Sequence, residues 1–94
     1  MQNTNPVSYI QLSADGVVKA SPGELYGVTV IASSTGIIRV YDNASAASGT
    51  LLWSSVSAVT AGSVIHFGGN GIKAKNGLFF DLVSGTATVN VLYV

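Results

Sequence analysis

The stretch LFFDLVSGTATVNVLYV, residues 78–94, decides the fold class. Apolar residues occupy alternate positions in its two halves, residues 78–83 and 87–94, as is typical of β-strands with one face toward a core. Between the halves, Ser84-Gly85-Thr86 has the composition of a turn. We therefore expect two short strands here, with Leu78 and Phe80 on an inward face and Asp81 on an outward one.

The rest of the chain repeats this pattern in short segments. Runs rich in β-branched and aromatic residues are separated by Gly, Ser and Asn, and no window has a convincing helical period. We expect about eight or nine short strands, because turns recur every ~8–12 residues. The expected strands cover residues 7–12, 17–20, 25–32, 37–42, 50–55, 63–67, 72–74, 78–83 and 87–94.

These segments predict an all-β fold, a single-domain antiparallel β-sandwich of jelly-roll type that spans residues 1–94. The polar residues 1–6 are a candidate flexible N-terminal arm. Asp15-Gly16 and Asn76-Gly77 are typical of tight hairpins. Residues 68–71, Gly-Gly-Asn-Gly, predict a sharp corner with positive φ angles.

The chain carries very little charge. It has four Lys or Arg and four Asp or Glu among 94 residues, so 9% are charged and the net charge is zero. A typical soluble domain is about 25% charged, and such an uncharged surface suits a protein packed against other protein. With no basic cluster, nucleic-acid binding is not expected. With no apolar run of about 18–20 residues, neither is a membrane helix.

Alternation also predicts which strand faces point outward. The faces that hold Arg39, Asp81 and Asn90 should be the outer ones, and the opposite faces should be buried. The inward residues are then Val28, Val30 and Ala32, Ile38 and Val40, and Ala87, Val89, Val91 and Tyr93. These outer faces also carry more apolar surface than a free monomer exposes comfortably. The apolar residues on them are Ile31, Ile37, Tyr41, Phe79, Val83 and Leu92. As candidate interface residues we select Ile37, Tyr41, Trp53, Phe79 and Asp81.

Catalytic and metal chemistry have little basis in this sequence. His66 is the single histidine and the chain has no cysteine, whereas a catalytic metal usually needs three protein ligands. We interpret His66 as a structural residue packed in a strand with one nitrogen hydrogen-bonded. Asp81 is unusual inside a strand. It pairs with Arg39, Lys73 or Lys75, or it forms an intersubunit salt bridge. We expect no enzyme, no cofactor and no metal site.

The aromatic residues leave two interpretations open. Trp53 and the four tyrosines, Tyr9, Tyr26, Tyr41 and Tyr93, could form a plate on which a sugar stacks. The other interpretation is that they pack in the core or at a protein interface, and we favour it because no cluster of polar or acidic groups accompanies them in the sequence.

Several stretches in order resemble a family of small virion proteins of tailed bacteriophages. They are SPGELYGV at residues 21–28, IRVYDN at 38–43, ASGTLL at 47–52, IHFG at 65–68, GLFF at 77–80 and SGTATV at 84–89. The pattern covers about residues 21–94, and the first 20 residues fall outside it.

The resemblance implies a capsid decoration (cement) protein that adds to the particle exterior as an oligomer, with no catalytic residues to transfer. We therefore expect a structural protein that stabilises the assembled capsid through contacts with the major capsid protein. It would be made in the host cytoplasm and located on the virion. A dimer and a trimer both remain open, and so does a head or tail position. The alternative is a receptor- or glycan-binding module on a fibre, spike or tail.

Overall fold

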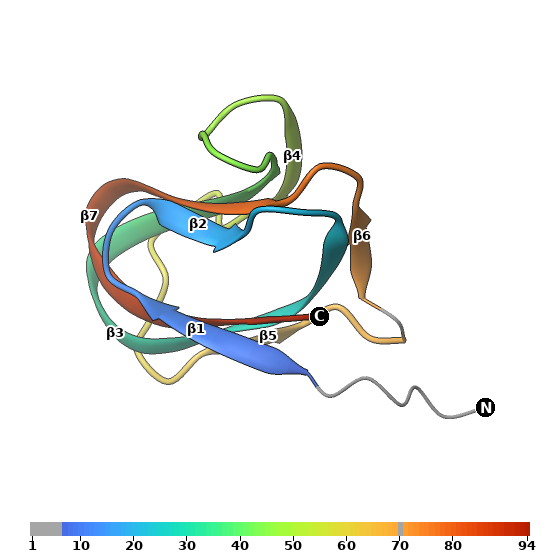
Figure 1. Cartoon of the computed structure of the whole chain (residues 1–94). Helices are drawn as coiled ribbons and strands as arrows, with labels where there is room; N and C mark the ends of the chain where they lie inside the picture. Colours follow the sequence, from blue (N-terminus) through green and yellow to red (C-terminus); the bar gives the residue numbers. More distant parts are fainter. Residues whose placement is uncertain (1–6, 70) are drawn as a thin grey trace.

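The protein is an all-β structure built from one antiparallel sheet. The computed structural model describes residues 7–69 and 71–94, and these residues form no helix. The expected arm at residues 1–6 and Asn70 of the expected corner lie outside the described residues. Along the chain the strands are β1 (Ser8–Leu12), β2 (Gly16–Lys19), β3 (Gly23–Asp42), β4 (Thr50–Ser54), β5 (Val64–His66), β6 (Ile72–Ala74) and β7 (Leu78–Tyr93) (Figure 1).

Two long strands, β3 and β7, organise the sheet. They pair antiparallel from Leu25 opposite Tyr93 to Tyr41 opposite Phe79. Both strands turn back midway, so the paired ribbon folds over and its two halves face each other (Figure 1). Each half of the ribbon is the centre of one layer. The first layer contains the N-terminal half of β3 and the C-terminal half of β7. In it, β1 pairs with β7, and β5 and β6 pair with β3. In the second layer, β2 pairs with the N-terminal half of β7, and β4 pairs with the C-terminal half of β3.

The bend in the β3–β7 ribbon depends on a close approach of the β3 and β7 backbones. Thr35 in β3 has φ 55° and Gly85 in β7 has φ 69°, and the register shifts beside Thr35. A Cβ atom on Gly36 would lie 2.7 Å from the carbonyl oxygen of Thr86, and one on Gly85 would overlap the carbonyl of Thr35. Two glycines thus allow the strands to stay paired while both change direction.

This bend explains why the expected number of strands is wrong. The segments at 25–32 and 37–42 are parts of β3, and those at 78–83 and 87–94 are parts of β7, so the described residues form seven strands. Ser84-Gly85-Thr86, interpreted as a turn between strands, lies inside β7, because β3 pairs with β7 on both sides of it. The two layers are therefore one continuous sheet.

The two expected hairpins are also wrong. β1 and β2 pair with β7 rather than with each other, and β6 pairs with β3 rather than with β7. Asp15-Gly16 instead lies where the chain passes from the first layer to the second, and Asn76-Gly77 leads from β6 into β7. Positive φ angles of 63°, 50° and 76° confirm the corner conformation at Gly68, Gly69 and Gly71.

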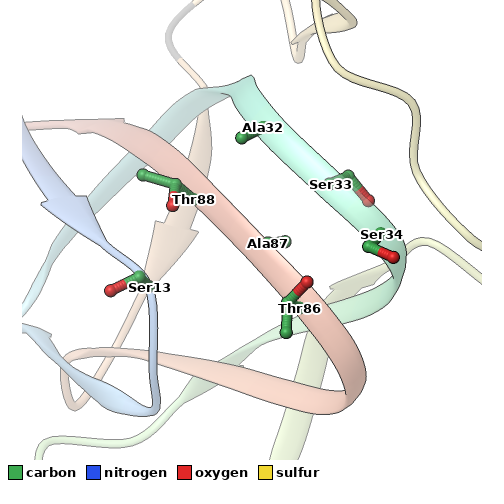
Figure 2. Close-up of a pocket in the computed structure, with 7 residues that line it drawn as sticks. All are labelled: Ser13, Ala32, Ser33, Ser34, Thr86, Ala87 and Thr88. Carbon is green, nitrogen blue, oxygen red and sulfur yellow. The ribbon is translucent and has the colours of Figure 1, made fainter.

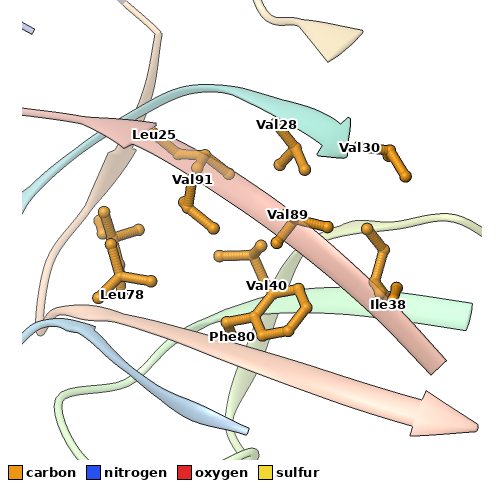
Figure 3. Packing of buried hydrophobic residues seen from close by; sticks show 12 residues of the cluster. Leu25, Val28, Val30, Ile38, Val40, Leu78, Phe80, Val89 and Val91 are labelled. Carbon is orange, nitrogen blue, oxygen red and sulfur yellow. The ribbon is translucent and has the colours of Figure 1, made fainter. Parts of the chain in front are cut away.

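The core lies between the two layers (Figure 3). The alternation correctly predicted the core residues Val28, Val30, Ile38, Val40, Leu78, Phe80, Val89 and Val91. It fails at two positions of β3 where the register shifts. Ala32, expected on the inward face of Val28 and Val30, is exposed, and Leu25, which has the parity of the outward Thr29, is fully buried. The side chains that are buried completely or almost completely are Leu25, Val28, Val30, Ile38, Val40, Leu78, Phe80, Val89 and Val91.

The bend yields a test with a matched control. Gly62 also has a positive φ angle, 88°, but a Cβ atom there would have no neighbour within 4 Å. Gly62→Ala should therefore cost only the backbone penalty of about 1–2 kcal/mol. Gly85→Ala should lower the free energy of unfolding by about 1–3 kcal/mol more, because the new methyl group overlaps Thr35. Urea denaturation of both variants measures the difference, and equal losses would contradict the close approach at Gly85.

Candidate interaction surface

Four of the five predicted interface residues lie on one surface. Ile37, Tyr41, Phe79 and Asp81 point outward from the second layer, as the alternation predicts and as the buried residues between them require. Tyr41 lies directly opposite Phe79 in the β3–β7 register. Each of the four is partly exposed. The structure therefore brings these four residues together, although they come from two distant parts of the chain.

The edge strands extend this surface with residues that the sequence analysis did not select. Val17 in β2 lies opposite Phe79, and Leu51 in β4 lies opposite Tyr41. Val17, Leu51 and Val83 are 39%, 45% and 41% exposed. Only the sheet register identifies Val17 as a neighbour of Phe79 and Leu51 as a neighbour of Tyr41. We call the set Val17, Ile37, Arg39, Tyr41, Leu51, Phe79, Asp81 and Val83 the outer face.

Trp53, the fifth predicted residue, does not belong to the outer face. It lies opposite Val40, a fully buried residue, and packs against the core from the inner side of β4. Its ring meets Phe67 edge to face, with centroids 6.0 Å apart and an interplanar angle of 67°. The register shift between Val40 and Tyr41 leaves an additional residue in β4, so alternation along β4 alone could not place Trp53.

The charged members of the outer face are Arg39 and Asp81, which lie opposite each other in the register. Arg39 donates a hydrogen bond to the hydroxyl of Tyr41 at 3.4 Å. Its Nε is buried without a hydrogen-bond partner among the described residues. The predicted partner Arg39 is therefore near Asp81, whereas Lys73 lies in β6 of the first layer.

Asp81 has a second charged neighbour that sequence reasoning missed. Burial raises the pKa of Asp81 above its ordinary value of 3.8, and repulsion by and hydrogen bonding with Asp15 raise it further, whereas Arg39 partly opposes the shift. Asp15 is held in place because its carboxylate accepts a hydrogen bond from the backbone N–H of Leu82 at 2.7 Å. The only sequence signal at Asp15 was that of a turn.

Neutralising Asp81 should stabilise the protein in a pH-dependent way. Because the folded-state pKa is raised, ionisation of Asp81 costs stability as pH rises through the range above 3.8. Asp81→Asn should therefore unfold at a higher urea concentration than the wild type at pH 7, and this gain should shrink toward pH 4. A gain independent of pH would contradict the raised pKa of Asp81.

The buried carboxylate of Asp42 connects the two long strands that form the outer face. Asp42, at the end of β3, is buried and accepts three backbone hydrogen bonds from the segment before β7. Its donors are Lys75 at 3.0 Å, Asn76 at 2.8 Å and Gly77 at 3.3 Å. These bonds, that from Lys75 first, outweigh burial and lower the pKa of Asp42 below 3.8. Asp42 thus fixes the start of β7 next to the end of β3.

Asp42→Asn tests this support and should have the opposite pH signature to Asp81→Asn. One amide oxygen replaces two acceptors and the amide N–H₂ faces a backbone N–H, so the variant should lose about 1–3 kcal/mol of unfolding free energy at pH 7. Because the folded-state pKa of Asp42 is lowered, the wild-type advantage exists above about pH 4 and disappears as pH falls through the folded-state pKa. Urea denaturation at pH 7 and pH 3 measures this. A loss that persists undiminished at pH 3 would contradict it.

His66 and the acidic side chains are the remaining candidates for catalytic or metal chemistry. His66 lies in β5 as expected, but its side chain is exposed, so the expectation that it is packed is wrong. Within residues 7–69 and 71–94, no three His, Asp or Glu side chains are grouped so that they could hold a metal ion. The same residues include no helix able to cross a membrane.

The aromatic side chains are dispersed over the molecule. Tyr9 points outward from the first layer, where it lies opposite Leu92, whereas Tyr41 points outward from the second. Tyr26 donates a hydrogen bond to Glu24 at 3.3 Å, and Trp53 faces the core. The described residues therefore do not bring the tryptophan and the tyrosines into one stacking plate.

A hollow of about 410 Å³ lies at the bend of β3 and β7 (Figure 2). Small side chains line it, and none of them ionises, so it offers no acid, base or strong metal ligand. The Ser33 hydroxyl accepts a hydrogen bond from the N–H of Gly36 at 3.2 Å. The lining residues are Ser13, Ala32, Ser33, Ser34, Thr86, Ala87 and Thr88.

Comparison of the chain with protein-family models, with curated proteins and with solved structures found no match.

Proposed function

We propose that this chain is a structural protein of a tailed-phage virion that decorates the capsid exterior and stabilises the assembled shell. The observation that carries the proposal is the outer face. On it, three apolar side chains are each about two-fifths exposed, and the charged side chains are Arg39 and Asp81, with Asp15 beside Asp81. Such a surface gains free energy when another protein surface covers it. The proposal assigns no catalytic residue and no cofactor.

The low overall charge supports the same assignment. With 9% charged residues and zero net charge, the chain has little ionic surface for charged ligands or for nucleic acid. The partner in this proposal is the major capsid protein, which presents the same site many times on the shell. The resemblance of residues 21–94 to small virion proteins supports the choice of a phage particle.

The mechanism is thermodynamic. A protein that binds the expanded shell but not its precursor stabilises the expanded state by mass action. Copies joined as a dimer or a trimer would bind with added avidity. Once one copy of the oligomer is bound, the next copy is held close to a neighbouring site on the shell. The same proposal classes the fold as a small β-sandwich of jelly-roll type, which the two facing layers around one core support.

Co-sedimentation tests the function directly. The purified protein is mixed with expanded heads of the parent phage that lack it and, separately, with unexpanded proheads. We expect saturable binding to expanded heads in a whole-number ratio to capsid symmetry sites. Binding to neither particle would overturn the proposal.

Charged substitutions test whether the outer face is the contact. Leu51→Asp and Val83→Asp, on the outer face, should each weaken binding at least about tenfold, because docking would bury an unpaired charge. Val64→Asp is the matched control. Val64 is 55% exposed but lies in β5, in the first layer, so its substitution should leave binding unchanged. Equal binding by all three variants would contradict the assignment of the outer face.

A further inference from the structure

The edges of the sheet differ in how well they resist pairing with another chain. β1, β2, β4, β5 and β6 each pair with one neighbour, so each has an open edge. An open edge invites intermolecular pairing unless the strand is very short, charged, bulged or interrupted by proline. Comparing the five strands on these points identifies the edge that is free to pair.

Four of the five carry such protection. β2 ends in Lys19 and has a register shift beside it. β4 has a register shift next to Leu51. β5 and β6 have three residues each, and Lys73 is the middle residue of β6. None of these edges offers a long, regular and uncharged row of backbone groups.

β1 has no such protection. Its five residues, Ser-Tyr-Ile-Gln-Leu, include no charge and no proline, and its register with β7 runs from Ser8 to Leu12 without a shift. Tyr9 is 66% exposed, and the adjoining Val7 is 50% exposed. The strand therefore combines regular geometry with an accessible, neutral edge.

The direction of its backbone groups follows from the neighbouring ladder. Glu24 and Val94 exchange two backbone hydrogen bonds, of 2.9 and 3.0 Å, so Val94 directs its polar groups toward β3. These groups alternate along a strand. Tyr93 therefore directs its N–H and C=O toward β1, where Ser8 is its partner. By the same alternation, Ser8 directs its backbone N–H and C=O toward β7, and Tyr9 directs its backbone N–H and C=O toward the open edge.

Tyr9 and Gln11 thus present backbone N–H and C=O groups at the open edge of β1, where no other described strand pairs with them. We propose that β1 pairs antiparallel with β1 of a second copy of this chain and so extends the first layer across a twofold axis. A second copy is the partner that the edges favour, because every other sheet edge within residues 7–69 and 71–94 is protected and two neutral β1 strands bring no like charges together.

The proposed pairing is compatible with the side chains of β1. If the twofold axis passes Ile10, Tyr9 of one copy lies opposite Gln11 of the other, and both point outward in both copies. Ile10 and Leu12, which pack against the core, then remain on the inner side. This inference does not depend on capsid binding, since the outer face lies on the second layer and leaves β1 free.

A proline in β1 can remove a backbone N–H at the open edge without removing one that bonds to β7. Gln11→Pro removes an N–H that points away from β7, so the β1–β7 pairing should survive. Gln11→Ala is its matched control: it loses the same side-chain hydrogen bond to Asn90 but keeps the N–H. Sedimentation velocity from about 10 µM to 1 mM should show a wild-type monomer–dimer equilibrium, retained in Gln11→Ala and at least about tenfold weaker in Gln11→Pro.

A second variant and a direct measurement guard against misfolding of Gln11→Pro. Tyr9→Lys introduces the charge that protects other edges and should also weaken the dimer, whereas Tyr9→Gln should not. Amide hydrogen exchange of the wild type should slow at Tyr9 and Gln11 as concentration rises, while Ile10 stays protected throughout.

Three results would overturn the inference. The first is a wild-type monomer at every concentration. The second is a dimer that neither Gln11→Pro nor Tyr9→Lys weakens. The third is a monomer whose binding to expanded heads is lost in Gln11→Pro but kept in Gln11→Ala, which would assign the edge to a capsid strand instead of a second copy. Failure of particle binding with the dimer intact would overturn only the proposed function.

Discussion

The close approach of β3 and β7 at their common bend is the constraint on which the rest of the structure depends. Hydrogen-bonded strands lie about 4.7–4.9 Å apart, and here both also change direction at the same point. Glycine at positions 36 and 85 leaves room for this, since a side chain at either would meet the opposite backbone. Because the pair stays connected through the bend, a single sheet supplies both layers and encloses the core without a second sheet.

The bend also determines where surfaces form. It places the inward side chains of both halves against one another, so each outward side becomes a separate face of the molecule. On the second layer, the N-terminal half of β7 and the C-terminal half of β3 join two distant segments into the outer face. Asp42 then secures the junction, because its three hydrogen bonds hold the chain that enters β7.

Properties that depend on neighbours in the sequence were predictable. The alternation of inward and outward residues is local, and it correctly placed Val28, Val30, Val89 and Val91 in the core. It also grouped Tyr41, Phe79 and Asp81 on outward faces. The strand type and the all-β class followed from the same local pattern, since period-two alternation requires no knowledge of which strands pair.

Properties that depend on distant partners were not predictable. The Asp15-Gly16 signal indicates a turn but not that the following strand joins β7 in the other layer. The proximity of Asp15 to Asp81 arises from that same crossing. The inward direction of Trp53 was not predictable, because the register shift in β4 reverses the phase of alternation and one strand's sequence does not reveal a bulge set by its partner.

The folded-over ribbon has a kinetic consequence. Even the closest pair of its ladder, Tyr41 and Phe79, is separated by the whole of β4, β5 and β6. The chain must therefore close a long loop, at an entropic cost, before the ladder can compensate for it. Neither half of the ribbon can form first as a local hairpin. Folding should accordingly be slow, on the order of milliseconds to seconds, with the meeting of β3 and β7 as its rate-limiting event.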